Sequence, residues 1–271
     1  MVFYVSKPDA YDDNGRLVKL GRERVRLEPN PFVSGETFEQ TIKLRQSEIV
    51  VKGDTQVMLK VWVDANEQVI HIEYDGNDER LMQVHFETWR EIEYTVKHTS
   101  ISDLYNTNLD AIATPDEENR YRTISYPDVV IPDRKDRIVW YHHNRKSGWP
   151  LTMRHHGLGD FKDNMTDPLL GRAFGGAIKG EGFAKISERA IQSDKGRRRH
   201  AKVFVLCQHP TTIDRWLNTL DKTIERVDKL LLKDAYKSHL GWWDDFWMRS
   251  WVHIGGAQGI MISYRHILIC M

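Results

Sequence analysis

Apolar and polar residues alternate along much of the first 100 positions. A period of two predicts half-buried β-strands, because successive side chains of a strand point to opposite faces of a sheet. Asp64-Ala65-Asn66-Glu67 and Asp75-Gly76-Asn77-Asp78 have the composition of hairpin loops. The pattern therefore predicts three strands in an antiparallel meander. The residues expected on their inner faces are Val57, Leu59, Val61 and Val63, then Ile70, Ile72 and Tyr74, then Met82, Val84 and Phe86.

Further strands are predicted before and after this meander. Asp13-Asn14-Gly15 offers the positive φ angles of a tight hairpin, ahead of a strand around Arg22 to Leu27. From about 100 to 136 the periodicity gives way to Asp, Asn, Thr and Pro, which predicts a long irregular surface segment. Runs of β-branched and aromatic residues at 137–142 and 201–207 predict two more strands.

The hydrophobic period changes to that of helices after Pro210. Apolar residues then recur at steps of three and four, and Thr211 with Asp214 resembles a capping box, so a helix is predicted to run to Lys233. This stripe consists of Ile213, Trp216, Leu217, Leu220, Ile224, Val227 and Leu231. A second helix is predicted from Asp234 through Trp251, with an aromatic stripe of Trp243, Phe246, Trp247 and Trp251.

Consecutive helices after a block of strands imply two structural units. We expect a mainly β, antiparallel domain over residues 1–209, a linker helix over 210–233, and the start of a helical domain over 234–271. With 271 residues and 31.8 kDa, the chain is long enough to bury a substantial core.

Composition narrows the range of partners. Lysine plus arginine and aspartate plus glutamate both number 39, so no net charge favours nucleic acid or an anionic membrane. The basic run 195–202 has no interleaved aromatic residue and is predicted to be a solvated loop. No apolar run approaches 18 residues, and Met1 to Ser6 does not have the pattern of a signal peptide.

Metal ions, disulfides and cofactors are not expected. Cys207 and Cys270 are the only cysteines, 63 positions apart and without a CxxC pair. The pairs His142/His143 and His155/His156 could each offer at most one ligand to a common ion if they lie on strands, because neighbouring strand residues face opposite ways.

Six ordered strings carry a resemblance to a known family. They are Tyr4 to Ala10, Asn14 to Arg22, Trp62 to Asn66, His142 to Ser147, Asp167 to Leu169 with Arg172 to Gly176, and His239 to Ser250. Together they resemble the N-terminal domain, catalogued as domain of unknown function 5703, of bacterial glycoside hydrolases similar to family 95 α-L-fucosidases. The matches extend over almost the whole chain.

The resemblance implies an antiparallel super-sandwich, a linker helix and the first helix of an (α/α)6 barrel that would supply the catalytic carboxylates. We therefore expect this chain to be a non-catalytic portion of a carbohydrate-processing enzyme that begins late in the sandwich, ends early in the barrel and is inactive alone. The family implies a periplasmic or secreted protein. Any ligand would be a carbohydrate, and the missing barrel or a second copy would cover the C-terminal aromatic helix.

Candidate residues near a substrate fall into two sets, while no catalytic residue is predicted. His142, Asn144, Ser147, Asp167 and Arg172 are interpreted as a polar seam of sandwich loops, either beside the substrate cleft or as internal scaffolding. Trp242, Trp243 and Trp247 are interpreted as barrel core or as sugar contacts.

Adjacent Asp244 and Asp245 diverge by about 100° around a helix, so they cannot easily flank one glycosidic bond. Two alternative functions remain open: a free-standing carbohydrate-binding or interaction sandwich, and a small hydrolase whose site is assembled between two copies.

Overall fold

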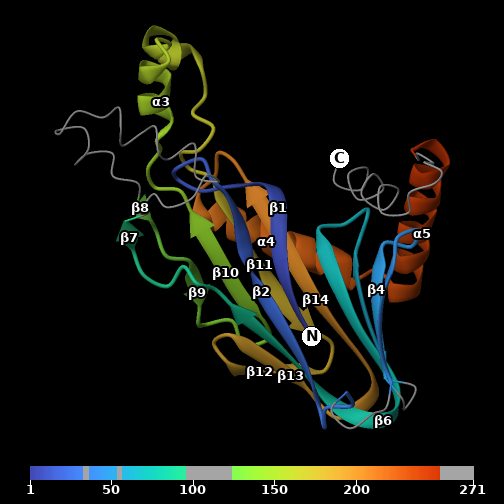
Figure 1. Cartoon of the computed structure of the whole chain (residues 1–271). Helices are drawn as coiled ribbons and strands as arrows, with labels where there is room; N and C mark the ends of the chain where they lie inside the picture. Colours follow the sequence, from blue (N-terminus) through green and yellow to red (C-terminus); the bar gives the residue numbers. More distant parts are fainter. Residues whose placement is uncertain (33–36, 54–56, 96–123, 251–271) are drawn as a thin grey trace.

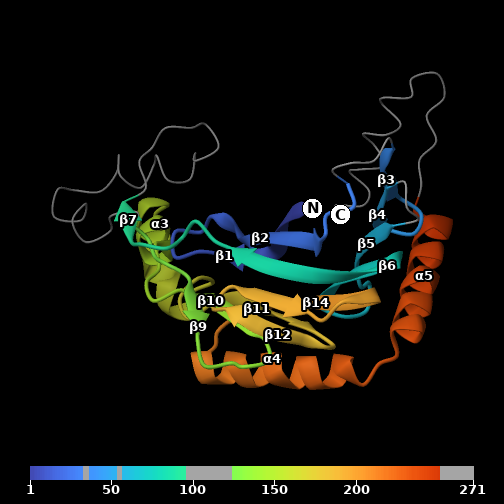
Figure 2. The ribbon, with the colours of Figure 1, turned by 90° about the horizontal axis from the view of Figure 1, so that it is seen from below.

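Two layers of antiparallel strands face one another, as Figures 1 and 2 show. The computed structural model describes residues 1–32, 37–53, 57–95 and 124–250. Helix α4 (Ile213–Asp228) lies along the outer side of one layer, and helix α5 (Leu232–Arg249) stands at one end (Figure 2). The mainly β, antiparallel architecture with helices after it, as predicted from the sequence, is confirmed.

The first layer contains the N-terminal hairpin. Its strands are β1 (Val2–Tyr11), β2 (Leu17–Glu28), the second half of β6 (Val69–Glu87), β13 (Ala190–Ser193) and β12 (Phe183–Ser187). The predicted turn between β1 and β2 is confirmed, because Gly15 has a φ of 75° and the Asp12 carboxylate accepts the backbone N–H groups of Asn14 and Arg16.

The second layer is larger and carries α4. In spatial order its strands are β3 (Phe38–Lys43), β4 (Glu48–Gly53), β5 (Met58–Val63), the first half of β6, β14 (Gly196–Gln208), β11 (Ala173–Gly180), β10 (Ile138–His143) and β9 (Val129–Ile131). All of these pairings are antiparallel.

Strand β6 belongs to both layers, which corrects one sequence prediction. Residues 75–78 do not form a hairpin; the chain continues as a strand. It pairs with β5 and β14 up to Asp75, with β14 once more at Arg80, and with β2 and β13 after that. Gly76 permits the passage, since a Cβ there would lie 2.5 Å from the Tyr74 hydroxyl. The polar residues that imitate a turn are exposed because the strand changes layers at this point.

The other loop predictions had mixed outcomes. The turn at 64–67 is confirmed, with the Asp64 carboxylate accepting the N–H groups of Asn66 and Glu67. The basic run 195–202 is not a loop but most of it is strand β14, paired with β6. Arg197 and Arg198 can remain exposed in a strand because that edge of the molecule faces solvent. Because the basic run 195–202 lacks alternating apolar and polar residues, its strand could not be predicted from the sequence.

The predicted irregular segment lies partly outside the described residues, which resume at position 124. Short strands β8 (Ile124–Ser125) and β7 (Tyr94–Thr95) pair there, and β9 follows. The predicted strands near 137 and 201 are confirmed as β10 and β14. Two short helices, α3 (Trp149–His155) and η2 (Gly159–Asn164), interrupt the β-rich part.

One apolar core fills the space between the layers, and a second lies between the larger layer and α4. Val57, Leu59 and Val61 are buried as predicted, but Val63, at the end of β5, is 56% exposed. Of the α4 stripe, Trp216, Leu220, Ile224 and Val227 are fully buried against the sheet.

The predicted helix boundaries need correction. Thr212, not Thr211, caps α4 by accepting the N–H of Arg215, and α4 ends at Asp228 rather than at Lys233. Leu231 continues the apolar stripe in sequence, but the chain turns before it, so Leu231 caps α5 and is 60% exposed. Trp251 lies outside the described residues.

Candidate functional site

A buried charged network fixes the end of strand β10. The His142 ring is 2% exposed, with Nε2 3.2 Å from Asp13 Oδ2 and Nδ1 3.2 Å from Asp128 Oδ1. Asp128 also accepts a hydrogen bond from Arg90 Nε at 2.8 Å. Burial favours a neutral imidazole, but the two carboxylates outweigh it and raise the pKa of His142 above its ordinary value. The network ties the β1–β2 turn to β10 and to the chain before β9.

The remaining residues of the predicted polar seam lie next to this network. Asn144 Nδ2 donates to the carbonyl oxygens of Tyr11 and Leu169, both at 3.0 Å, and the Asn144 N–H donates to Arg172 O at 2.8 Å. Ser147 Oγ donates to Asp167 Oδ1 at 2.9 Å. The structure thus gathers His142, Asn144, Ser147, Asp167 and Arg172 at one end of the sandwich.

These seam residues are used mainly in internal hydrogen bonds. The Asp167 carboxylate also accepts the N–H groups of Leu169 and Leu170, and the Arg172 guanidinium donates to the carbonyl oxygens of Asp9 and Pro168. The Asn144 Oδ1 atom is buried and has no hydrogen-bond partner within the described part of the chain. The arrangement holds the loops after β10 and before β11 in one conformation.

Helix α5 is anchored at the other end of the sandwich through its first turns. His239 is fully buried; its Nε2 lies 2.8 Å from Gln46 O, and its Nδ1 accepts the N–H of Ala65 at 3.3 Å. Burial lowers the pKa of His239, so the ring is neutral and Nε2 carries the proton. Tyr236 donates to Glu48 Oε2 at 2.6 Å.

Stacked rings lie beneath this anchor. The Trp62 indole stacks on His71 at 4.0 Å between centroids, and His71 Nδ1 lies 2.9 Å from His200 Nε2. His71 Nε2 lies 3.5 Å from Asp64 Oδ2. Burial and the neighbouring His71 ring lower the pKa of His200 to about 3. The rings therefore form an aromatic layer between strand and helix.

The second half of α5 presents an aromatic face. Trp242 stacks on Phe246 at 5.7 Å, and Trp243 lies 6.2 Å from Trp247. Trp242 is 43% exposed and Met248 is 75% exposed. The indole N–H groups of Trp243 and Trp247 are buried, and among the described residues neither finds an acceptor. Because these N–H groups are covered, the part of the face that is open to a partner is formed by Trp242 and Met248.

The two predicted sets of site residues do not meet. Thr211, just before α4, donates its N–H to Gly171 O beside the polar seam, whereas α5 follows the far end of α4. A helix of 16 residues is roughly 24 Å long, so α4 separates the sets by about that distance. Asp244 forms an ion pair with Arg45 at 3.2 Å, and Arg249 donates to the backbone oxygen of Asp245.

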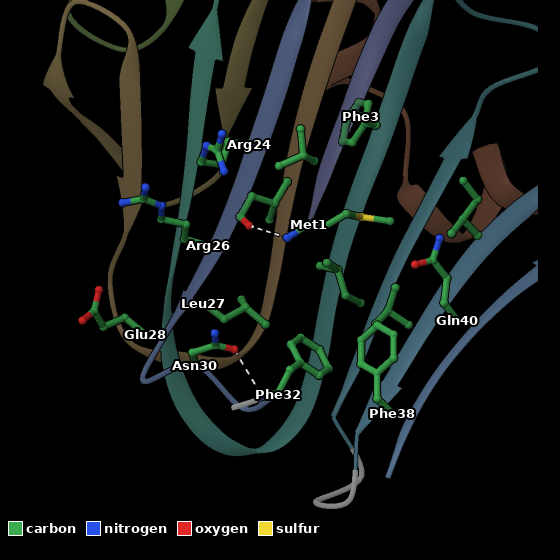
Figure 3. A pocket seen from close by; sticks show the side chains of 15 residues that line it. Met1, Phe3, Arg24, Arg26, Leu27, Glu28, Asn30, Phe32, Phe38 and Gln40 are labelled. Atoms are coloured by element: carbon green, nitrogen blue, oxygen red, sulfur yellow. Dashed lines mark hydrogen bonds between the residues drawn. The ribbon is translucent and has the colours of Figure 1, made fainter. Parts of the chain in front are cut away.

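A groove lies in the fork where the two layers separate beside β6. It encloses about 550 Å³ between the β1–β2 hairpin and strands β3 to β5 (Figure 3). Phe32 and Phe38 meet edge to face across its lower end, 5.8 Å apart. The other labelled residues in Figure 3 are Met1, Phe3, Leu27, Glu28, Asn30 and Gln40, together with Arg24 and Arg26, whose side chains point away from the two phenylalanines.

Glu23 lies on the inner face beside this groove and was not anticipated from the sequence. It pairs in register with Phe3 and stands two positions before Val25, and both of these residues line the groove. Its side chain is fully buried and neither oxygen has a hydrogen-bond partner in the described part of the chain. Burial raises the pKa of Glu23 well above its ordinary value, so the acid is neutral. The alternation of β2 places Glu23 inward, which was a signal available in the sequence.

Across residues 1–32, 37–53, 57–95 and 124–250, histidine, cysteine and acidic side chains form no group of three able to hold a metal ion. None of the helices described here has both the length and the apolar character needed to cross a membrane.

Comparisons with known proteins give one family and similarity to several solved structures. No curated protein matches the chain. A solved chain titled "Putative kojibiose phosphorylase from human microbiome" is similar with a TM-score of 0.46 and 8% identity, over 99% of this chain and 34% of that one. This chain thus spans about a third of the length of that protein. The model of a domain of unknown function, DUF5703_N, matches residues 1–252, and the chain therefore belongs to the DUF5703 family.

Proposed function

We propose that this chain is the non-catalytic β-sandwich portion of a carbohydrate-processing enzyme of the glycoside hydrolase type. In this proposal the sandwich carries α5 as the attachment surface for a helical domain that holds the catalytic carboxylates. The resemblance to fucosidase-like hydrolases supports the assignment to carbohydrates and makes fucosides the first substrates to examine.

The arrangement of α5 is the observation that carries the proposal. Its first turns are held rigidly by His239 and Tyr236, while Trp242 and Met248 on the later turns remain exposed. A neighbouring helix supplies ridges that pack between exposed apolar side chains such as these, so helix packing favours a helical partner.

The carboxylates on α5 are poor candidates for catalysis. Glycoside hydrolysis needs two carboxyl groups on opposite sides of the scissile bond, about 5 to 9.5 Å apart depending on the mechanism. Asp244 and Asp245 are adjacent on a helix, and Asp244 is paired with Arg45 at the surface. This supports an inactive chain.

The polar seam is proposed to border the substrate cleft from the sandwich side. His142 and Asp13 hold the seam loops rigidly, which is what a loop that positions a substrate requires. Because the seam and the α5 aromatic face are separated by the length of α4, one sugar residue cannot contact both. In this proposal the cleft is bordered by the seam, and Trp243 and Trp247 belong to the packing between domains.

Aryl glycosides test the proposal directly. The chain is incubated with 4-nitrophenyl fucosides, galactosides and glucosides, and release of nitrophenol is compared with that of the heat-denatured chain. We expect no release. Release abolished by Asp244→Asn or Asp245→Asn would make the chain a hydrolase in its own right, and release that survives both changes would reveal a site elsewhere; either result contradicts the proposal.

A fusion protein tests whether α5 attaches the sandwich to a catalytic helical domain. Joined to the helical domain of a longer member of the family, the sandwich is expected to support glycoside turnover. The double variant Trp242→Lys with Met248→Lys is expected to lose that turnover, while Leu17→Lys, at an exposed position of β2, keeps it. Equal turnover in all three fusions would count against α5 as the attachment surface.

A further inference from the structure

We propose that the outer face of the layer β1–β2–β6–β13 binds a neutral oligosaccharide, with Tyr4 and Trp89 as its stacking residues. The inference rests on the proposed carbohydrate function and places a second, non-catalytic sugar site on the sandwich. Helix α4 covers the outer face of the opposite layer, whereas no described helix covers this one (Figure 2).

Strand register defines which side chains share this face. Directly opposite residues of antiparallel strands point to the same side of a sheet. Tyr4, Arg22 and Glu87 therefore form one row across β1, β2 and β6. The next two rows are Val2, Arg24 and His85, and then Arg26, Gln83 and Gln192. The alternate residues Met82, Val84 and Phe86 are buried, which assigns the rows to the outer face.

Two aromatic rings stand at one end of these rows. Tyr4 is 57% exposed and Trp89 is 49% exposed, and their centroids lie 6.0 Å apart at an angle of 66°. The Arg22 guanidinium lies 5.8 Å from the Tyr4 ring, and that of Arg90 lies 5.6 Å from the Trp89 ring. The cations hold both rings in place while leaving about half of each side chain in water, as a stacking surface for the C–H face of a sugar requires.

Several polar groups beside the rings are paired with one another. Arg22 Nε and Arg24 Nε donate to the two oxygens of Glu87 at 2.5 and 2.6 Å, and these bonds lower the pKa of Glu87. Gln83 Nε2 donates to Gln192 Oε1 at 2.7 Å. The face therefore holds planar donors and acceptors in fixed positions beside the rings, and such groups suit the hydroxyl groups of a sugar.

The size of the apolar area argues against a protein partner. Among the described rows and the loop beside them, the large exposed apolar residues are Val2, Tyr4, Trp89 and Ile92. Standard protein interfaces bury about 800 Å² per partner around an apolar centre, and a set of four such residues between arginines is a small centre for one. A sugar chain needs one or two rings and a line of hydrogen-bonding groups, and these rows provide both.

Calorimetric titration of the intact chain tests the site. The probes are maltohexaose, cellohexaose and xylohexaose, with tetragalacturonate as the charged comparison. At least one neutral probe is expected to bind, with an affinity that does not change with salt, since no charge is screened in the contact. Trp89→Ala and Tyr4→Ala should each weaken binding about tenfold. Phe161→Ala, which removes a comparably exposed aromatic ring from η2, should leave it unchanged.

Three outcomes would overturn the inference: none of the neutral probes binds, binding is unaffected by Trp89→Ala, or tetragalacturonate binds more tightly and weakens with salt. Trp89 follows β6 rather than lying in it, so its replacement leaves the strand pairing intact. Trp89→Phe is expected to restore part of the affinity. The fusion and aryl-glycoside experiments do not involve Tyr4 or Trp89. If no oligosaccharide binds, the proposed function is therefore unaffected. If the proposed function is contradicted, oligosaccharide binding to this face can still be measured.

Discussion

His71 and His200 lie edge to edge across strands β6 and β14, with Nδ1 of the first 2.9 Å from Nε2 of the second. The rings are 5.1 Å apart and nearly parallel, and Trp62 stacks on the other side of His71. Only one proton can occupy the line between the two nitrogens. The pair is therefore stable only while at least one ring is neutral, which makes it sensitive to acid.

Acid should destabilise the fold through His200. Its pKa of about 3 lies below the ordinary value of 6.5, so between these values the unfolded chain binds a proton that the folded chain does not. The stability from this group is present above pH 6.5 and is lost as the pH falls toward 3. Urea unfolding at a series of pH values measures how the free energy of unfolding changes with pH. His200→Gln should flatten this part of the profile, and an unchanged slope would contradict the assignment.

Glu23 should have the opposite dependence. Its folded pKa lies well above the ordinary value of 4.5, so the unfolded chain loses a proton first as the pH rises, and stability falls above pH 4.5. Glu23→Gln keeps the shape of the side chain but has no ionisable group, so it removes the loss of stability above pH 4.5. We expect the variant to unfold at higher urea concentration than the parent at pH 8 and at nearly the same concentration at pH 4. A variant that is less stable at both would show that the carboxyl has a partner.

Two glycine replacements should shift stability in opposite directions. A Cβ on Gly176 would lie 2.1 Å from Phe204 O, in the backbone of the paired strand, which cannot yield. Gly176→Ala should therefore destabilise the fold by about 3 kcal/mol or more. Gly241 lies in α5 with open space around its Cβ position, so Gly241→Ala should stabilise the chain by about 0.5 to 1 kcal/mol. Thermal melting of both variants provides the comparison.

The α5 aromatic face should promote association of the isolated chain. Trp242 and Met248 are exposed, and apolar area of this kind gains about 25 cal/mol for each Å² covered. Sedimentation is expected to show association that increases with concentration and is reduced by Trp242→Lys with Met248→Lys. Leu17→Lys, which removes a residue that is 57% exposed on β2, is the control. Equal association in both variants would place the contact elsewhere.

The fold could be predicted where hydrophobic periodicity and local turn chemistry agreed. Asp64 and Gly15 mark true turns, and the stripe from Trp216 to Val227 marks a true helix. The prediction at 75–78 was wrong because a strand that changes layers exposes polar residues in the middle of its length. The end of α4 was misplaced because Leu231 continues an apolar stripe by spacing alone, and spacing does not show where the chain turns.

The candidate sites were predictable to a smaller extent. The seam from His142 to Arg172 was identified as a group, and the structure brings its members together through backbone carbonyls that no sequence pattern reveals. Tyr4 and Trp89 are 85 positions apart and meet only because β1 and β6 flank β2. Whether the seam residues lie near a substrate stays a prediction.

The sharing of β6 between the layers has a consequence for how the molecule opens. Its amides bond to β5 and β14 along one half and to β2 and β13 along the other, so neither layer can separate while β6 stays in place. The two halves of the sandwich should therefore exchange their amide hydrogens as a single cooperative unit, without a partly open state in which one layer is intact. Since β6 and β14 are paired over a sequence separation of 129 residues at His71 and His200, that unit closes only after the whole β-rich region has been synthesised.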